Sequence, residues 1–262
     1  MTFPTTHVAA LAVLLTVPAM AQQSASRAAL DPEHTAWTQV LATYVKAGEV
    51  DYGGMKERGQ PALDAYLRAL ESVRPAEYAG FTREQRLAFW VNAYNAYTVR
   101  LILNHYPLKS VRKIGFLPLA AFRERFIPLK AVGDEVMSLN DIEHTHLREK
   151  LKDPRIHFAI VCASKSCPLL RSEAYRTSTI DAQLDAAARG FLADGFRNQI
   201  NPASGTAKVS SIFKWFRGDF TQGGKTLGAF MAAYTEPTVA EFLRKKGDDL
   251  DFLDYDWSLN GR

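Results

Sequence analysis

The sequence predicts an α+β or α/β fold: a single helix-rich domain with a central buried helix, a β-hairpin and a small sheet. Amphipathic helical patterns fill most of residues 36–106, whereas short segments that favour strands appear only after Pro107. The 262 residues are 47% hydrophobic, enough to bury a sizeable core. Since no internal repeat or low-complexity linker divides the chain, we expect one domain over residues 31–262.

Three helices are expected in the first half of that domain. Residues 36–45 and 61–73 each place apolar side chains on one helical face. Residues 82–106 begin with a capping box, S/T-x-x-E/Q, and are then apolar on nearly every face, which is typical of a buried central helix. Two amides on this helix, Asn92 and Asn95, need hydrogen-bond partners, so they either brace a neighbouring loop or line a polar cavity.

The second half mixes short strands with helices. A Gly-Asp turn at residues 133–134 between two β-like segments predicts the hairpin, and alternation of large and small apolar residues predicts a buried strand. In chain order the expected elements are a hairpin over 125–139, a helix over 140–151, a strand over 155–162, a helix over 179–195, a strand over 207–216 that enters an aromatic turn, and a helix over 226–246.

The first 21 residues differ from the rest of the chain. An apolar run over residues 8–18 precedes Ala-Met-Ala at 19–21, which fits a signal peptide with its cleavage site, although no Lys or Arg precedes the run. The run is too short to span a bilayer. We expect a cleaved signal peptide over residues 1–21, a short polar lead-in over 22–30, and a periplasmic or secreted protein; the alternative is a buried amino-terminal helix.

The charge pattern argues against nucleic-acid binding. The net charge is +4, but basic and acidic residues alternate and no basic block is interleaved with aromatic residues. No later segment is apolar enough to be transmembrane. Because Gly-rich phosphate loops, G-x-S-x-G and H-E-x-x-H are all missing, we expect no cofactor and no serine hydrolase of the α/β type. The expected partner is an unidentified small-molecule or peptide substrate, with the oligomeric state left open.

Cys167 is the residue with the clearest signs of reactivity. Pro168 suits the first position of a helix over residues 168–175, which makes Cys167 its N-cap. A thiol there lies at the positive end of the helix dipole, and Lys165 adds a nearby cation. Both effects stabilise a thiolate, so Cys167 is the candidate nucleophile.

His144 is the candidate base for that thiol. It falls in the first turn of the helix expected over residues 140–151, where a neutral imidazole is favoured. Glu143 either orients His144 or, three residues after Asn140, completes a capping box. His157 lies within an apolar segment, which favours a hydrogen-bonded histidine in the core.

Cys162 leaves other chemistries open. It can close a disulfide with Cys167 if the turn brings their Cα atoms within ~6 Å, and an oxidising compartment favours that bond. An accessible disulfide would be redox-active, although C-x4-C is not the thioredoxin-like spacing. The two cysteines with His144 and His157 also make a Cys2His2 set for zinc, but their spacing matches no zinc-finger pattern, so a metal ranks last.

Several stretches resemble the family catalogued as domain of unknown function 547. These are residues 89–103, 138–144, 153–170 and 212–220, with a similar ending at 252–260, in the order the family has them. The resemblance implies no agreed activity, and some animal members join this domain to glutaredoxin and DEP domains, which favours thiol chemistry only by association. One departure is the single proline after Cys167, where the family often has a second. The positions that match the family motifs are Asn92, Asn95, Glu143, His144, His157, Cys162, Cys167, Lys214 and Trp215.

Three functions therefore stay open. The first is an exported thiol-dependent hydrolase or acyltransferase, with Cys167 as nucleophile, His144 as base, and Glu143, Asn92 or Asn95 as orienting group. The second is a non-catalytic binding or accessory domain stabilised by a Cys162–Cys167 disulfide. The third is a redox protein that uses the same bond.

Overall fold

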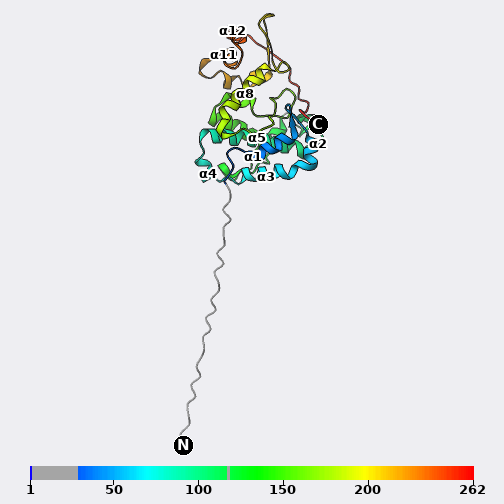
Figure 1. The fold of residues 1–262 in the computed structure, drawn as a ribbon, viewed down its shortest axis with the longest axis vertical. Coiled ribbons are helices and arrows are strands. Elements are labelled where there is room, and N and C mark those ends of the chain that lie inside the picture. Colours follow the sequence, from blue (N-terminus) through cyan, green and yellow to red (C-terminus); the bar gives the residue numbers. More distant parts are fainter. Residues whose placement is uncertain (2–28, 117–118) are drawn as a thin grey trace.

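The computed structural model describes Met1, residues 29–116 and residues 119–262, and it confirms the α+β class. The expected signal peptide and most of the polar lead-in, residues 2–28, lie outside the described residues. Figure 1 shows the amino-terminal helices in one body, with residues from about α8 onward stacked at one end of it. The helices are α1 Thr35–Tyr44, α2 Tyr52–Gly54, α3 Gln60–Glu71, α4 Pro75–Ala79, α5 Arg83–His105, α6 Ala120–Arg123, α7 Leu139–Asp141, α8 Ile180–Ala193, α9 Ser211–Trp215, α10 Arg217–Phe220, α11 Leu227–Ala232 and α12 Pro237–Lys246.

Short 3-10 and π-helical segments connect these helices, and the strands are few and short. The segments are η1 Met55–Gly59, η2 Val111–Lys113, η3 Lys130–Val132, η4 Ile142–Leu151, η5 Pro154–Phe158, η6 Thr177–Thr179 and η7 Gln222–Gly224, of which η1 and η4 are π-helices. The strands are β1 Val45–Lys46, β2 Glu49–Val50, β3 Gln199–Asn201, β4 Thr206–Val209 and β5 Asp251–Phe252. The first two pair antiparallel, β3 pairs antiparallel with β4, and β4 pairs parallel with β5.

Helix α5 is the central buried helix that the sequence predicts. Thr82 and Gln85 form the expected capping box at its start. Every residue from Leu87 to Val99 is buried, and the helix packs against α3, α8 and η4. With neighbours on every side, α5 can fix the position of loops that cross it.

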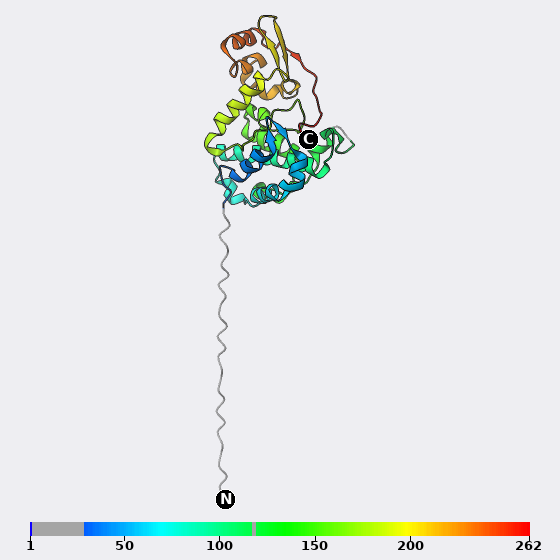
Figure 2. The same ribbon diagram turned by 45° about the vertical axis from the view of Figure 1, so that its right-hand side comes forward.

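Two hydrophobic clusters make up the core. The larger surrounds α5 and takes in α1, α3 and the loop that holds Cys167. The smaller is an aromatic cluster in the later part of the chain, which forms one end of the molecule in Figure 2. Phe158 of η5 belongs to this second cluster, so η5 connects the two. The rings of the second cluster are Phe158, Phe191, Phe213, Phe220 and Phe230.

The predicted strand over residues 155–162 is not formed, and that prediction was wrong. Asp153 caps, and Pro154 begins, the 3-10 helix η5 instead. The backbone groups that follow bond to a side chain rather than to a neighbouring strand. Asn95 Nδ2 donates to the carbonyl of Ala159 (2.9 Å), and the N–H of Val161 donates to Asn95 Oδ1 (2.9 Å). One amide thus replaces the strand partner that the alternating pattern implied.

The hairpin over 125–139 was also wrong: it is reduced to one antiparallel pair. Ile127 and Met137 exchange both backbone hydrogen bonds, 3.0 and 2.8 Å long. Pro128 follows at once and has no N–H to extend the ladder, and the chain turns into η3. The long helix expected over 226–246 divides into α11 and α12, because Pro237 begins a new helix.

The helix predicted to begin at Pro168 is absent, which was a third error. Residues 168–175 run as an irregular segment. Its far end is fixed by α5, since Asn92 Nδ2 donates to the carbonyl of Tyr175 (2.6 Å) and the N–H of Tyr175 donates to Asn92 Oδ1 (3.0 Å). Cys167 is therefore not at the start of a helix.

The chain after Trp257 returns to the amino-terminal body. Gly261 pairs with Val50 beside β2, and Figure 1 places the carboxyl-terminal residue near α2. A Cβ on Gly261 would lie 2.0 Å from the carbonyl oxygen of Val50, so only glycine fits this approach. This return carries residues 255–260 across the loop that holds both cysteines.

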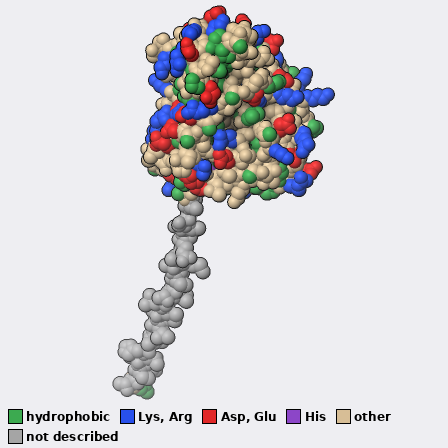
Figure 3. All heavy atoms as spheres, turned by 45° about the horizontal axis from the view of Figure 1, so that its top comes forward, with side chains coloured by type: hydrophobic (Ala, Val, Ile, Leu, Met, Phe, Trp, Pro, Cys, Tyr) green, Lys and Arg blue, Asp and Glu red, His purple; other side chains and the backbone are tan. Residues whose placement is uncertain are grey.

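The described surface mixes charges of both signs. On the face in Figure 3, Lys and Arg side chains are interspersed with Asp and Glu. Among the helices of the described residues, none has the length and apolar character needed to cross a membrane.

Replacing Asn95 with alanine is expected to lower the free energy of unfolding by about 2–4 kcal/mol, because it strips two buried backbone groups of their partner. Urea denaturation measures the change. The matched control is Asn104→Ala, which removes an exposed amide from the same helix and is expected to stay within about 0.5 kcal/mol of the wild type. Equal effects of the two substitutions would refute the bracing role of Asn95.

Candidate active site

A cavity of about 530 Å³ lies between the two hydrophobic clusters and contains the cysteines. Aromatic side chains form much of its wall: Tyr94, Phe122, Trp215, Phe216, Tyr255 and Trp257. Its polar and ionisable lining residues are Arg112, Asn140, Glu143, His144, His157, Cys162 and Cys167. A mostly apolar cavity with few polar groups is typical of a site for a small organic ligand.

The loop over residues 162–167 positions both thiols and is held from two sides. The buried Arg197 donates from Nε to the carbonyl of Cys167 and from Nη2 to the carbonyl of Lys165, both at 2.6 Å. The returning chain holds the other side, where Lys165 N–H donates to Ser258 O (2.8 Å). Ala163 has a φ of 60°, a left-handed conformation that these contacts maintain.

Cys162 is the activated thiol of the site. Its Sγ lies 3.0 Å from Ser164 Oγ and 3.2 Å from Tyr255 Oη, and the thiol of Cys167 also hydrogen-bonds to it. Burial alone would raise the pKa of Cys162, but hydrogen bonds from Cys167, Ser164 and Tyr255 outweigh burial and lower the pKa to about 7. The lowered pKa favours the thiolate form of Cys162 near neutral pH.

Cys167 has the opposite character. It is 3% exposed, and the pKa of its thiol is raised well above the ordinary value by burial and by the neighbouring Cys162. The backbone N–H of Cys162 donates to Cys167 Sγ at 2.8 Å. Both cysteines are free thiols in the structure, so the disulfide considered from the sequence is not formed.

Glu143 faces the cavity instead of capping a helix. The capping box belongs to Ser138 and Asp141, so the expected N-cap Asn140 lies inside the helix and Glu143 is left free. Burial raises the pKa of the Glu143 carboxyl to about 7, against a smaller lowering by Arg148, and the Cys162 thiolate adds to the rise. Tyr94 Oη lies 3.4 Å from Glu143 Oε2. Glu143 and Cys162 thus titrate in the same pH range.

A hydrogen-bonded chain joins the two histidines of the cavity. Arg148 Nη1 donates to His144 Nδ1 (2.5 Å), Arg148 Nε donates to Asp219 Oδ2 (2.5 Å), and His157 Nε2 lies 2.7 Å from the same oxygen. Burial and the Arg148 cation lower the pKa of His144. Burial lowers the pKa of His157 despite its hydrogen bond to Asp219.

The hydrogen bonds of this chain assign the protons of both rings. A guanidinium has no lone pair to offer, so His144 Nδ1 is an acceptor and the proton of its neutral ring sits on Nε2. His144 is then a donor toward the cavity and not a ready base. In His157 the carboxylate of Asp219 fixes the proton on Nε2, which leaves Nδ1 as the acceptor.

The remaining residues singled out from the sequence are spread over several places. Trp215 lines the cavity and stacks near Trp257 at 5.7 Å between ring centroids. Asn92 and Asn95 are buried braces and do not line it. Lys165 and Lys214 are exposed and do not line it either, Lys214 lying over the ring of Phe252.

Sequence reasoning missed Tyr94, Arg148, Asp219 and Tyr255. Arg148 lies four residues after His144, a helical spacing that places the two side chains together and was available as a signal. Asp219 and Tyr255 lie inside the two family-like stretches, residues 212–220 and 252–260, but nothing local distinguishes them from surface residues. Their roles depend on contacts across 62 and 93 residues of chain.

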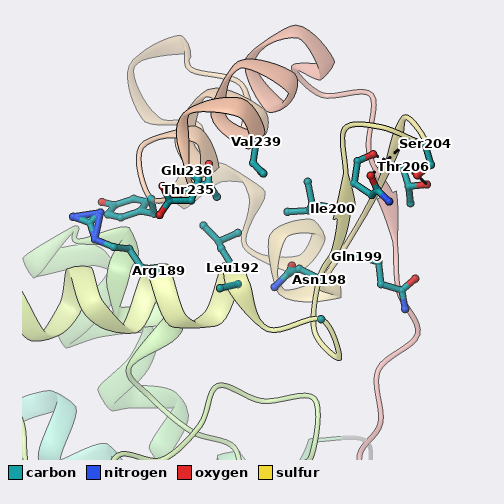
Figure 4. A pocket seen from close by; sticks show the side chains of 14 residues that line it. Arg189, Leu192, Asn198, Gln199, Ile200, Ser204, Thr206, Thr235, Glu236 and Val239 are labelled. Carbon is teal, nitrogen blue, oxygen red and sulfur yellow. Dashed lines mark hydrogen bonds between the residues drawn. The ribbon is translucent and has the colours of Figure 1, made fainter.

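The described residues contain no cluster of three or more His, Cys, Asp and Glu side chains that could hold a metal ion. A second cavity, of about 570 Å³, lies among the end of α8, the β3–β4 hairpin and the start of α12. In Figure 4, Leu192, Ile200 and Val239 gather in its middle, with Arg189 and Glu236 to one side. No cysteine or histidine lines it, whereas both cysteines line the first cavity.

The resemblance noted in the sequence is confirmed over part of the chain. Residues 78–192 match the family model described as "Protein of unknown function, DUF547". The matched stretch contains α5, Glu143, His144 and both cysteines, whereas Asp219 and Tyr255 lie beyond it. No curated protein and no solved structure matches the chain.

Alkylation of Cys162 by iodoacetamide is expected to rise with pH and to reach half its maximal rate near pH 7, because only the thiolate reacts and burial is outweighed by hydrogen bonds to it. Tyr255→Phe removes one donor to the thiolate and is expected to move that midpoint up by about 1 pH unit. Quantitative mass spectrometry follows the reaction. Tyr234→Phe, the same change beside the second cavity, serves as the control and should leave the midpoint in place.

Proposed function

We propose that this protein is a thiol-dependent hydrolase or acyltransferase whose nucleophile is Cys162. The observation that carries the proposal is the placement of an activated thiol, Cys162, and a half-buried carboxyl group, Glu143, in one aromatic cavity. Perturbed ionisable groups that meet in a cavity are characteristic of catalytic sites. The substrate is an ester, thioester or amide with an apolar or aromatic acyl group, since aromatic rings form much of the wall.

In the first step the Cys162 thiolate attacks the acyl carbon. The S–C bond forms, the bond to the leaving group breaks, and Glu143 in its acid form gives its proton to the leaving group. The products are a Cys162 thioester, the protonated leaving group and a Glu143 carboxylate. Because thiol and carboxyl both have a pKa of about 7, thiolate and carboxylic acid coexist at neutral pH.

In the second step Glu143 takes a proton from water or from an acceptor alcohol or amine as that nucleophile attacks the thioester. The S–C bond breaks, Cys162 leaves as the thiolate, and Glu143 is again an acid. Each group returns to its starting protonation state, so the cycle needs no other reactant. Water as the nucleophile gives hydrolysis, and a bound acceptor gives acyl transfer.

The attack on the acyl carbon produces a tetrahedral intermediate with a negatively charged oxygen. His144, held by the hydrogen-bonded chain through Arg148, supplies a hydrogen-bond donor for this oxyanion. The proton on His144 Nε2 is held there by Arg148, and the lowered pKa of His144 keeps the ring neutral. A neutral imidazole with a lowered pKa can polarise a substrate carbonyl through its N–H in this way. Asp219 and His157 fix Arg148 in turn, so they position His144 without touching the substrate.

This proposal differs from the dyad expected from the sequence in its assignments. The nucleophile is Cys162 instead of Cys167, because the helix that would have activated Cys167 is absent. The proton-transfer group is Glu143 instead of His144, because Arg148 occupies the accepting nitrogen of His144. We further propose that the protein acts after export, on the basis of the signal-peptide pattern in residues 1–21.

Brief incubation with p-nitrophenyl butyrate is expected to leave a butyryl group on Cys162. Trypsin separates the two cysteines, because it cuts after Arg155, Lys165 and Arg171, so peptide 156–165 reports Cys162 and peptide 166–171 reports Cys167. Mass spectrometry should find the acyl group on the first peptide only, and Cys162→Ala should abolish it. An acyl group on the second peptide would show that Cys167, and not Cys162, is the nucleophile. No acylation of either peptide would favour the non-catalytic binding domain.

Glu143→Gln is expected to lower kcat/KM for the same ester by about 100-fold, since an amide can neither give nor take the proton. It should also remove the Glu143 ionisation from the pH–rate profile. Glu149→Gln is the matched control, because Glu149 is exposed on the same π-helix and does not line the cavity. A Glu143→Gln protein that folds normally and keeps the wild-type rate would rule out this role.

A further inference from the structure

The two cysteines are neighbours in space, and acyl transfer uses only one of them. The backbone N–H of Cys162 reaches Cys167 Sγ at 2.8 Å, and the two side chains share a hydrogen bond. Both cysteines line the cavity, but Cys162 is partly exposed whereas Cys167 is only 3% exposed. One thiol can meet a small reagent, and its neighbour is shielded from it.

We propose that Cys162 and Cys167 form a hydroperoxide-responsive dithiol, in which Cys167 captures the oxidised form of Cys162 as an intramolecular disulfide. This activity goes beyond acyl transfer and does not require it. The oxidant is a hydroperoxide, and the reductant that restores the pair is a low-molecular-weight thiol.

The oxidation takes place in two balanced steps. The Cys162 thiolate attacks the terminal oxygen of the hydroperoxide, the O–O bond breaks, and the alkoxide or hydroxide that leaves takes a proton from the solvent to become an alcohol or water. Cys162 is then a sulfenic acid. Cys167 attacks that sulfur, an S–S bond forms, the S–O bond breaks, and the hydroxyl group leaves with the Cys167 proton as water.

The reduction is ordinary thiol–disulfide exchange. Two molecules of a small thiol give up two electrons and two protons, become one disulfide, and return both cysteines to their thiol forms. Cys162 is the more exposed of the two cysteines in the cavity and is therefore the one that a small thiol attacks.

The electrostatics of the pair assign the order of events. Burial is the largest cause of the raised pKa of Cys167. The next two causes come from Cys162: a hydrogen bond to its thiolate and the charge of that thiolate. Sulfenic acid formation removes that negative charge. Burial still raises the pKa of Cys167, but the thiol is then easier to ionise than in the reduced pair, which favours its attack on the oxidised neighbour.

The surrounding contacts keep the pair in register for bond formation. Arg197 holds the carbonyls of Lys165 and Cys167, and Asn260 N–H donates to the carbonyl of Ala163 (3.1 Å). Asn95 fixes the backbone at Val161, just before Cys162. Because the backbone is held near both cysteines, the two sulfur atoms have few relative positions to sample before they reach the geometry of a disulfide.

Hydrogen peroxide, added to the reduced full-length protein, is expected to join tryptic peptides 156–165 and 166–171. The joined species should be two hydrogens lighter than the sum of the two peptides, and a small thiol should reverse it. The rate of joining should rise with pH around 7, following the Cys162 thiolate. Free thiols are blocked with N-ethylmaleimide before digestion, so that exchange during digestion does not contribute.

Cys167→Ala is expected to leave Cys162 as a sulfenic acid that reacts with dimedone and then gains further oxygen. Oxygen addition to peptide 156–165 in the wild type, without joining, would overturn the proposal, and so would no change in either peptide. The wild-type measurement stands even if the variant does not fold. Because no acyl substrate is used, a negative result here leaves acyl transfer untouched, and failure of butyrylation leaves the dithiol untouched.

Discussion

The geometry of the site depends on two buried amides of α5. Asn95 holds the backbone at Ala159 and Val161, and Asn92 holds it at Tyr175. The segment between these anchors contains both cysteines. A rigid buried helix thus fixes an irregular loop at each end, where regular secondary structure would not have given the sharp turn at Ala163. The contacts from Arg197 and Tyr255 are made to the middle of this loop, between the two points that α5 holds.

The ionisable groups of the cavity fall into two sets. Arg148 and Asp219 form a charged pair, and burial lowers the pKa of both His144 and His157, which favours their neutral forms. Cys162 and Glu143 both titrate near neutral pH. In the proposed reaction only Glu143 gives and takes a proton, and its pKa of about 7 lets it do both near neutral pH at little cost in free energy.

Part of this arrangement could be predicted from the sequence. The capping box and apolar surface of α5 are local signals, and they were right. The strand and the helix expected on either side of Cys162 and Cys167 were wrong, since apolar alternation and an X-Pro step describe a buried irregular loop equally well. What distinguishes the alternatives are bonds from Asn95, Asn92 and Arg197, and no local pattern contains them.

The hydroxyl group of Tyr255 reaches the Cys162 sulfur across 93 residues of sequence. During synthesis from the amino terminus, the loop with both cysteines therefore exists long before that hydroxyl is available. A nascent chain lacks this contact, so the pKa of Cys162 is fully lowered only when Tyr255 has packed against the loop. The low pKa of Cys162 is therefore a property of the completed fold and not of the local sequence around the thiol.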